Sequence, residues 1–201
     1  MKKYLIAGLI ALFLAVPAAS RDEAASAKAF LQEKIDAVLG ILENAEISDA
    51  QKRGKIESIV DPVFDYPLMA KLTLGRKYWP RLSAEEQRVF TDRFTARLKA
   101  SYFDKITIYS GDMDAGVSYG AARFQGGKVH VPVEVKAGDE TIDIAYKLYS
   151  SAGDWRIYDV EINGVSIISS YRSQFDQVLS HGSVDDLLEE LKRPEAAEQS
   201  H

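Results

Sequence analysis

The side chains best suited to acid–base chemistry are two carboxylates, Asp159 and Glu161, set two positions apart in a mostly apolar and aromatic stretch. A carboxylate held in an apolar pocket can act as a general base, and the neighbours Tyr158 and Val160 suggest that Asp159 is partly buried. An aspartate here can also accept hydrogen bonds from a neighbouring turn. We expect this structural role, and Asp159 as a base remains an alternative, enzymatic hypothesis.

No second group completes a catalytic or metal site around these carboxylates. The run Gly164-Val165-Ser166 has the start of a nucleophile elbow, but Ile168 stands where that motif needs glycine. The chain has no cysteine, and its three histidines are scattered at positions 130, 181 and 201, so a zinc site is not expected. No glycine-rich phosphate loop follows a predicted strand. The sequence therefore predicts a protein that is not an enzyme and holds no metal or cofactor.

Composition narrows the function classes further. The 201 residues include 25 basic and 30 acidic side chains, and the formal net charge of −5 disfavours a nucleic-acid-binding face. Ten tyrosines, eight phenylalanines and two tryptophans provide aromatic surface for an interior. Such residues can fill a solid core or line an apolar cavity, and the pattern alone does not distinguish the two.

The first 20 residues have the pattern of a secretory signal peptide. Two lysines precede an uncharged, mostly apolar run, 4–16, and small residues follow it. The run is shorter than the about 20 apolar residues that cross a bilayer, so an uncleaved anchor is the less favoured alternative. Cleavage after Ala18 and cleavage after Ser20 both fit. We expect one exported domain over residues 21–192 and a disordered polar tail over residues 193–201.

Helices account for most of the predicted elements. Apolar periodicity predicts helices over residues 22–44 and 48–60, followed by a short segment, 66–74, and a linker that begins at Gly75. Ser83 and Glu86 form a capping-box pair that predicts another helix start. Large apolar residues recur every four positions along that helix: Phe90, Phe94, Leu98, Tyr102 and Ile106. Two further helices are predicted over residues 167–179 and 183–191.

Ahead of the last two helices, the hydrophobic period changes from helical to alternating. Four strands are predicted, over residues 117–125, 128–136, 141–149 and 155–162, and short turns join them. The middle strands have one apolar and one polar side, as in an antiparallel sheet with one covered face. Pro132 cannot donate a ladder hydrogen bond, so its strand should be partly unpaired there. The predicted fold is α+β: a four-stranded antiparallel sheet, covered by N- and C-terminal helices.

Two stretches of the chain together form a recognisable pattern. The first combines Leu74-Gly75, Ser83–Arg88, the row of large apolar residues described above, and Tyr109-Ser110-Gly111. The second runs from Trp155 to Val160 and continues with Gly164-Val165-Ser166, Tyr171-Arg172, Phe175 and Gly182. In these residues the chain resembles the MlaC family, also called the toluene-tolerance auxiliary proteins, and the likeness covers nearly all of the chain that follows the predicted signal peptide.

The resemblance implies a periplasmic phospholipid carrier in the system that maintains outer-membrane lipid asymmetry. Its partners would be a lipid-binding ring protein of an inner-membrane ABC transporter and a lipoprotein complex in the outer membrane. The acyl tails would lie between the curved sheet and the helices, in a lipid cavity. A polycyclic, hopanoid-like lipid is an alternative ligand that the resemblance also allows.

Side-chain facing and period assign residues to this cavity. The sheet would contribute Val133, Ile144, Tyr146 and Leu148, the helices Phe90, Phe94, Leu98, Tyr102, Ile167, Tyr171 and Phe175, and the rim Leu72, Leu74 and Trp79. Arg172 could neutralise a phosphate near the mouth, although a surface salt bridge is the expected role. Besides the enzymatic hypothesis, a periplasmic adaptor with a solid core that bridges two partners stays open.

Overall fold

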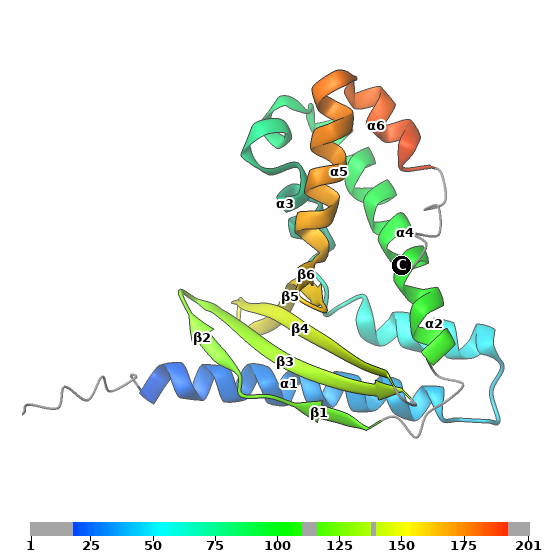
Figure 1. Ribbon diagram of the computed structural model, residues 1–201, viewed down its shortest axis with the longest axis vertical. Helices are drawn as coiled ribbons and strands as arrows, with labels where there is room; N and C mark the ends of the chain where they lie inside the picture. Colours follow the sequence, from blue (N-terminus) through cyan, green and yellow to red (C-terminus); the bar gives the residue numbers. More distant parts are fainter. Residues whose placement is uncertain (1–17, 110–115, 138–139, 193–201) are drawn as a thin grey trace, which may run out of the picture.

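The computed structural model describes residues 18–109, 116–137 and 140–192, and these form six α-helices, one 3₁₀ turn and six strands (Figure 1). Residues 1–17 of the predicted signal peptide and the predicted tail, 193–201, lie outside the described residues. The five predicted helices are all present, with ends shifted by a few residues, and the short segment over residues 66–74 belongs to a sixth. They are α1 (Ala18–Leu42), α2 (Asp49–Val60), α3 (Tyr66–Tyr78), α4 (Ala84–Tyr109), α5 (Ile167–His181) and α6 (Val184–Glu190), and η1 (Trp79–Arg81) replaces the predicted linker.

Side-chain capping explains where several helices begin. Ser48 caps α2 and Ser183 caps α6, each in a reciprocal pair with the residue three positions on. Before α4, Ser83 Oγ accepts from the Glu86 N–H at 3.3 Å, and Glu86 Oε2 accepts from the Ser83 N–H at 2.7 Å. The capping box predicted at Ser83 is therefore confirmed.

The strands form one antiparallel sheet in the order β1-β3-β4-β5-β6, and β2 pairs with the first residues of β3. Their bounds are β1 (Val117–Tyr119), β2 (Arg123–Gln125), β3 (Lys128–Ala137), β4 (Glu140–Ser151), β5 (Asp154–Ile162) and β6 (Val165–Ser166). The structure thus confirms the α+β class but corrects the strand count from four to six. The first predicted strand is divided into β1 and β2, and β6 is an addition.

The division between β1 and β2 lies opposite Pro132 of β3. The carbonyl oxygen of Pro132 accepts from the Gly120 N–H at 2.9 Å, so the backbone of Pro132 faces the side on which β1 ends. Proline has no N–H with which to continue the ladder on that side. The missing donor therefore gives a physical reason why one predicted strand becomes two.

Helix α1 runs along the sheet beside β2 and β3 (Figure 1). The small residues Ala24 and Ala27 of α1 are buried, which lets the helix approach the strands closely. Farther along, α1 packs instead on α2, where Leu42 and Ile56 form a second, smaller hydrophobic cluster. The last part of α1 thus forms an arm with α2 that has its own small core, whereas the first part of α1 belongs to the main core.

Helices α3, α4, α5 and α6 pack together at one end of the sheet (Figure 1). Gly75 interrupts α3 with φ 58° and ψ −165°, a conformation that is essentially restricted to glycine. Arg172 of α5 donates two hydrogen bonds, 3.1 and 2.6 Å long, to the carbonyl oxygen of Leu72 in the turn before this kink. Arg172 therefore ties α5 to α3, and the expected surface salt bridge is wrong.

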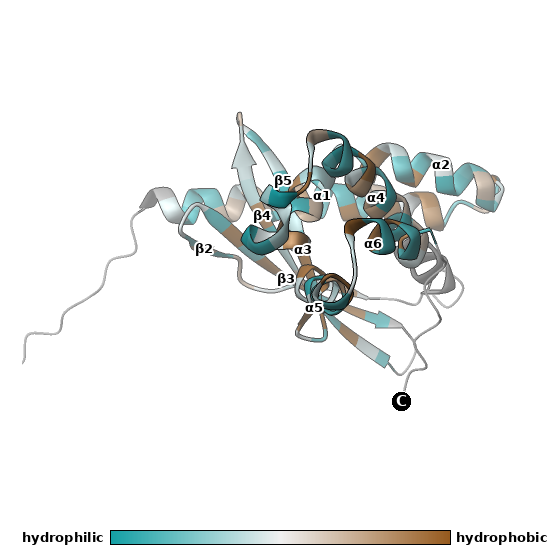
Figure 2. Cartoon of the chain, turned by 90° about the horizontal axis from the view of Figure 1, so that it is seen from above, coloured by the Kyte–Doolittle hydropathy of each residue, from teal (hydrophilic) through white to brown (hydrophobic). Residues whose placement is uncertain are grey.

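Within the described residues, no helix combines the length and apolar character that crossing a membrane requires. The helices carry hydrophilic as well as hydrophobic residues along their length (Figure 2). Their apolar sides join the sheet in one main core.

Candidate functional site

One part of the apolar sheet face, towards the strand ends where Ala137 of β3 pairs with Glu140 of β4, is only half-buried. Register explains its composition: Tyr119 lies opposite Val133, Val133 opposite Ile144, and Ile144 opposite Ile162, so these side chains share one face. The half-buried members, which we call the outer apolar face, are Val117, Tyr119, Val135, Ile144, Tyr146 and Ile162. The apolar side chains of α1 pack on the main core as far as Ile35 and on α2 from Val38 on, so α1 covers this part of the sheet incompletely.

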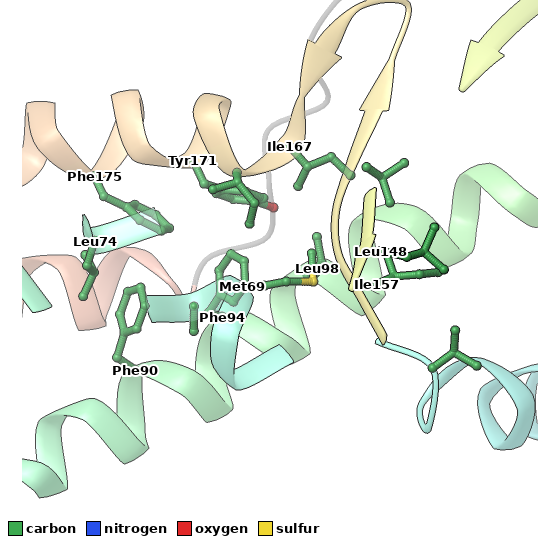
Figure 3. Packing of buried hydrophobic residues seen from close by; sticks show 14 of the residues in the cluster. Met69, Leu74, Phe90, Phe94, Leu98, Leu148, Ile157, Ile167, Tyr171 and Phe175 are labelled. Carbon is green, nitrogen blue, oxygen red and sulfur yellow. The ribbon is translucent and has the colours of Figure 1, made fainter. Parts of the chain in front are cut away.

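Inward of the outer apolar face, side chains of α3, α4 and α5 pack in one cluster with Leu148 and Ile157 of the sheet (Figure 3). The rings of Phe90 and Phe94 stack with centroids 6.0 Å apart, and Phe175 meets Phe90 edge-on at 5.6 Å. The exposed fraction of all three side chains is 0%. A side chain that lined even a water-sized void would keep some accessible surface. These residues therefore form a packed core.

The other residues assigned to the cavity from sequence fall into three groups. Buried in the same core are Leu74, Leu98, Val133, Leu148, Ile167 and Tyr171. Half-buried are Leu72 and Trp79 on the helices and Ile144 and Tyr146 on the outer apolar face. Tyr102 belongs to α4, but its side chain lies outside the described residues. Contact between any of these side chains and a lipid stays a prediction.

Four residues of the outer apolar face were not assigned from the sequence: Val117, Tyr119, Val135 and Ile162. Strand alternation carries the signal for them, because each occupies the same side of its strand as the assigned residues. The sequence does not show that these residues are only half-buried, because their burial depends on how far α1 extends over the sheet.

Two hydroxyl groups lie on the outer apolar face. Tyr119 donates to Asp36 Oδ1 of α1 at 3.4 Å, whereas the hydroxyl of Tyr146 has no hydrogen-bond partner among the described residues. Burial raises the pKa of Tyr146 to about 12, and burial together with the nearby Asp36 carboxylate raises that of Tyr119 to about 12. Both groups stay neutral near pH 7, so the outer apolar face carries no charge.

Asp159, the alternative catalytic candidate, is buried with 4% of its surface exposed. Its Oδ2 accepts from Lys147 Nζ at 2.9 Å and from Ser166 Oγ at 2.8 Å, and its Oδ1 accepts from the Ile168 N–H at 3.2 Å. Burial disfavours the charge of Lys147, but hydrogen bonds to Glu161 and Asp159 outweigh it and raise the pKa of Lys147. Asp159 thus fixes the start of α5 to the sheet, which is the structural role expected from the sequence.

Two pockets open on the surface near these elements. One, of about 460 Å³, lies between α1 and β2, and the other, of about 300 Å³, includes Glu134, Asp143 and Glu161 in its lining. Both fall in the lower half of the range of roughly 300–1,000 Å³ for sites of drug-sized ligands, and a two-tailed lipid is larger. The carboxylates of the second pocket do not gather as metal ligands would, since no such cluster of three occurs in the described part of the chain.

Comparisons with known proteins agree with this architecture. The family model of the MlaC protein matches residues 32–193. The chain is 24% identical over 132 residues to toluene tolerance protein ttg2D of Pseudomonas putida, a match that spans 65% of this chain but only 60% of that relative. It also resembles a phospholipid-binding protein from Ralstonia solanacearum, solved in complex with a phospholipid, with a TM-score of 0.72 and 24% identity over 83% of this chain and 94% of that one.

The structural likeness confirms the α+β fold, and the family model spans most of the chain, including all of the sheet and nearly all of the helical core. The resemblance inferred from Leu74-Gly75 and from the stretch that begins at Trp155 is therefore confirmed. This protein belongs to the MlaC family.

Proposed function

We propose that this protein is a phospholipid carrier whose acyl-tail site is built on the outer apolar face. The observation that carries the proposal is a neutral, half-covered apolar surface in a member of the MlaC family. A solved protein of similar fold was obtained in complex with a phospholipid, which supports the same ligand class here.

The energetics of lipid transfer explain why such a surface suffices. A two-tailed lipid in water exposes on the order of 30 methylenes, each costing about 0.8 kcal/mol, or roughly 24 kcal/mol in all. A carrier lowers this cost by covering the tails with apolar side chains, and it needs neither a nucleophile nor a cofactor. The carrier would work in the periplasm after loss of residues 1–20. It would move lipid between an inner-membrane ABC transporter complex and an outer-membrane lipoprotein complex.

Complete insertion of two tails requires more room than the outer apolar face provides. The packed core inward of it, which includes Leu98, Val133 and Leu148, would have to separate from the covering helices. The separate core of the α1–α2 arm would stay intact in such a rearrangement, whereas Ala27 and Leu31 of α1 would lose their contacts with the main core. Burial of the tails would offset the contacts that are lost.

Lipid analysis of the purified protein tests this function. The protein would be isolated without detergent and extracted with organic solvent, and the extract quantified by mass spectrometry. We expect about one phospholipid per chain. An extract without stoichiometric lipid, from protein that remains folded, would exclude the carrier function.

The packed aromatic core favours one other candidate, a non-enzymatic adaptor that joins two membrane complexes. An adaptor needs only a stable core and two binding surfaces, and the ring contacts of Phe94 and Phe175 provide such stability. It would retain no lipid in the extraction, so the same measurement separates the two candidates.

A further inference from the structure

The larger of the two surface pockets, of about 460 Å³, combines an apolar floor with a basic rim. Residues of α1 and of the segment that leads into β2 line it: Ser20, Arg21, Ala24, Ala25, Lys28, Ala122, Arg123 and Phe124. The alanines leave the space open because their side chains are short, and the half-buried ring of Phe124 extends the apolar surface. Removal of residues 1–20 would take only Ser20 from this lining.

The three cations of the rim differ in how they are held. Lys28 Nζ donates to the carbonyl oxygens of Tyr119 and Gly120 at 3.2 and 3.0 Å, which fixes its ammonium group at the pocket. Arg21 and Arg123 are exposed and have no hydrogen bond or ion pair with any described residue. No carboxylate lines the pocket, although acidic residues outnumber basic ones in the chain by 30 to 25. The lining itself is therefore positively charged.

We propose that this pocket binds a phosphate group carried on an apolar stem, as in an anionic phospholipid. Phosphate oxygens accept hydrogen bonds from guanidinium and ammonium groups, and each arginine can donate two parallel hydrogen bonds to one phosphate group. The alanines and Phe124 cover the adjoining apolar part of the ligand. The site is distinct from the outer apolar face and does not depend on whether that face takes acyl tails.

Calorimetric titration of the purified protein with dihexanoyl phosphatidylglycerol, a short-chain lipid studied below its micelle concentration, tests the proposal. We expect saturable binding that weakens with added salt and falls about tenfold in Arg123→Gln and in Arg21→Gln, as for loss of a charged hydrogen bond. Arg76→Gln, which removes an exposed cation of α3, is the matched control and should bind like the wild type.

One further ligand, inorganic phosphate, separates the sources of the phosphate group. Inorganic phosphate should bind much more weakly than the short-chain lipid, because it cannot use the apolar floor. Equal affinity for the two would overturn the proposal of an amphiphilic ligand. The proposal also fails if the wild type does not bind the lipid, or if both arginine variants bind it as tightly as the wild type does.

Discussion

Asp159 accepts hydrogen bonds from groups on β4, β6 and α5, so its removal should loosen the joint between the sheet and this helix. Asp159→Ala leaves Lys147 with Glu161 alone and deprives the Ile168 N–H of its acceptor. We expect a loss of about 2–4 kcal/mol in the free energy of unfolding, measured by urea titration. Asp143→Ala, an exposed carboxylate on β4, should change it by less than about 0.5 kcal/mol. Equal effects of the two substitutions would contradict the role assigned to Asp159.

The tyrosines of the outer apolar face make stability sensitive to alkaline pH. Because burial raises the pKa of Tyr146 from 10.0 to about 12, the folded state holds this proton more tightly than the unfolded chain does. Its contribution is fully present below about pH 10 and is lost as the pH rises towards 12, by at most about 2.7 kcal/mol. Urea titrations at about pH 9 and pH 11.5 should show a smaller decrease for Tyr146→Phe than for the wild type. An identical decrease would mean that Tyr146 is not buried as described.

At the scale of the elements, the kink of α3 depends on Gly75. A side chain there would strain the backbone at φ 58°, whereas Gly54 in the middle of α2 has open space around it and no such constraint. We expect Gly75→Ala to lower the free energy of unfolding by about 1–3 kcal/mol. Gly54→Ala should raise it by roughly 0.5–1 kcal/mol, since alanine favours a helix interior. Thermal or urea unfolding measures both, and a stabilising Gly75→Ala would show that the kink is not required.

The elements that sequence patterns predicted well are those set by local interactions. Ser48, Ser83 and Ser183 each mark a helix start through hydrogen bonds within four residues, and alternation in β3 and β4 identifies the apolar side of each strand. The division of the first predicted strand was missed because it arises where Gly120 meets Pro132 of another strand. The bonds of Arg172 to Leu72 were missed for the same reason, since 100 residues separate the two.

At the scale of the whole molecule, the sequence could show which residues face the interior but not how far apart the facing layers stand. The row that includes Phe90 and Phe94 fits the wall of a cavity and a packed core equally well, and the structure has the packed core. The incompletely covered surface lies beside this core. The apolar side chains of α1 pack on the sheet only as far as Ile35, and those that follow pack on α2. Which part of the sheet is packed and which is half-covered therefore depends on the path of α1, and local sequence patterns do not show that path.

The difference between the packed core and the half-buried outer apolar face determines where a bulky residue would block lipid without destabilising the fold. Facing alone would suggest Leu148, but its exposed fraction is 0%, so Leu148→Trp should overpack the core and cost about 1–3 kcal/mol or more. Ile144 lies four residues earlier on the same face and is half-buried, which leaves room for a larger ring. We therefore expect Ile144→Trp to reduce the lipid recovered per chain several-fold while changing the free energy of unfolding by less than about 1 kcal/mol.

The comparison is informative because each variant is measured in both ways, by lipid extraction with mass spectrometry and by urea unfolding. Thr141→Trp, an exposed position at the start of the same strand, controls for the added indole and should leave both quantities near their wild-type values. If Ile144→Trp keeps its full lipid content and stays folded, the tails do not lie on the outer apolar face. If it unfolds as readily as Leu148→Trp, the outer apolar face is as tightly packed as the core, and the space required by a ligand would have to be found elsewhere in the molecule.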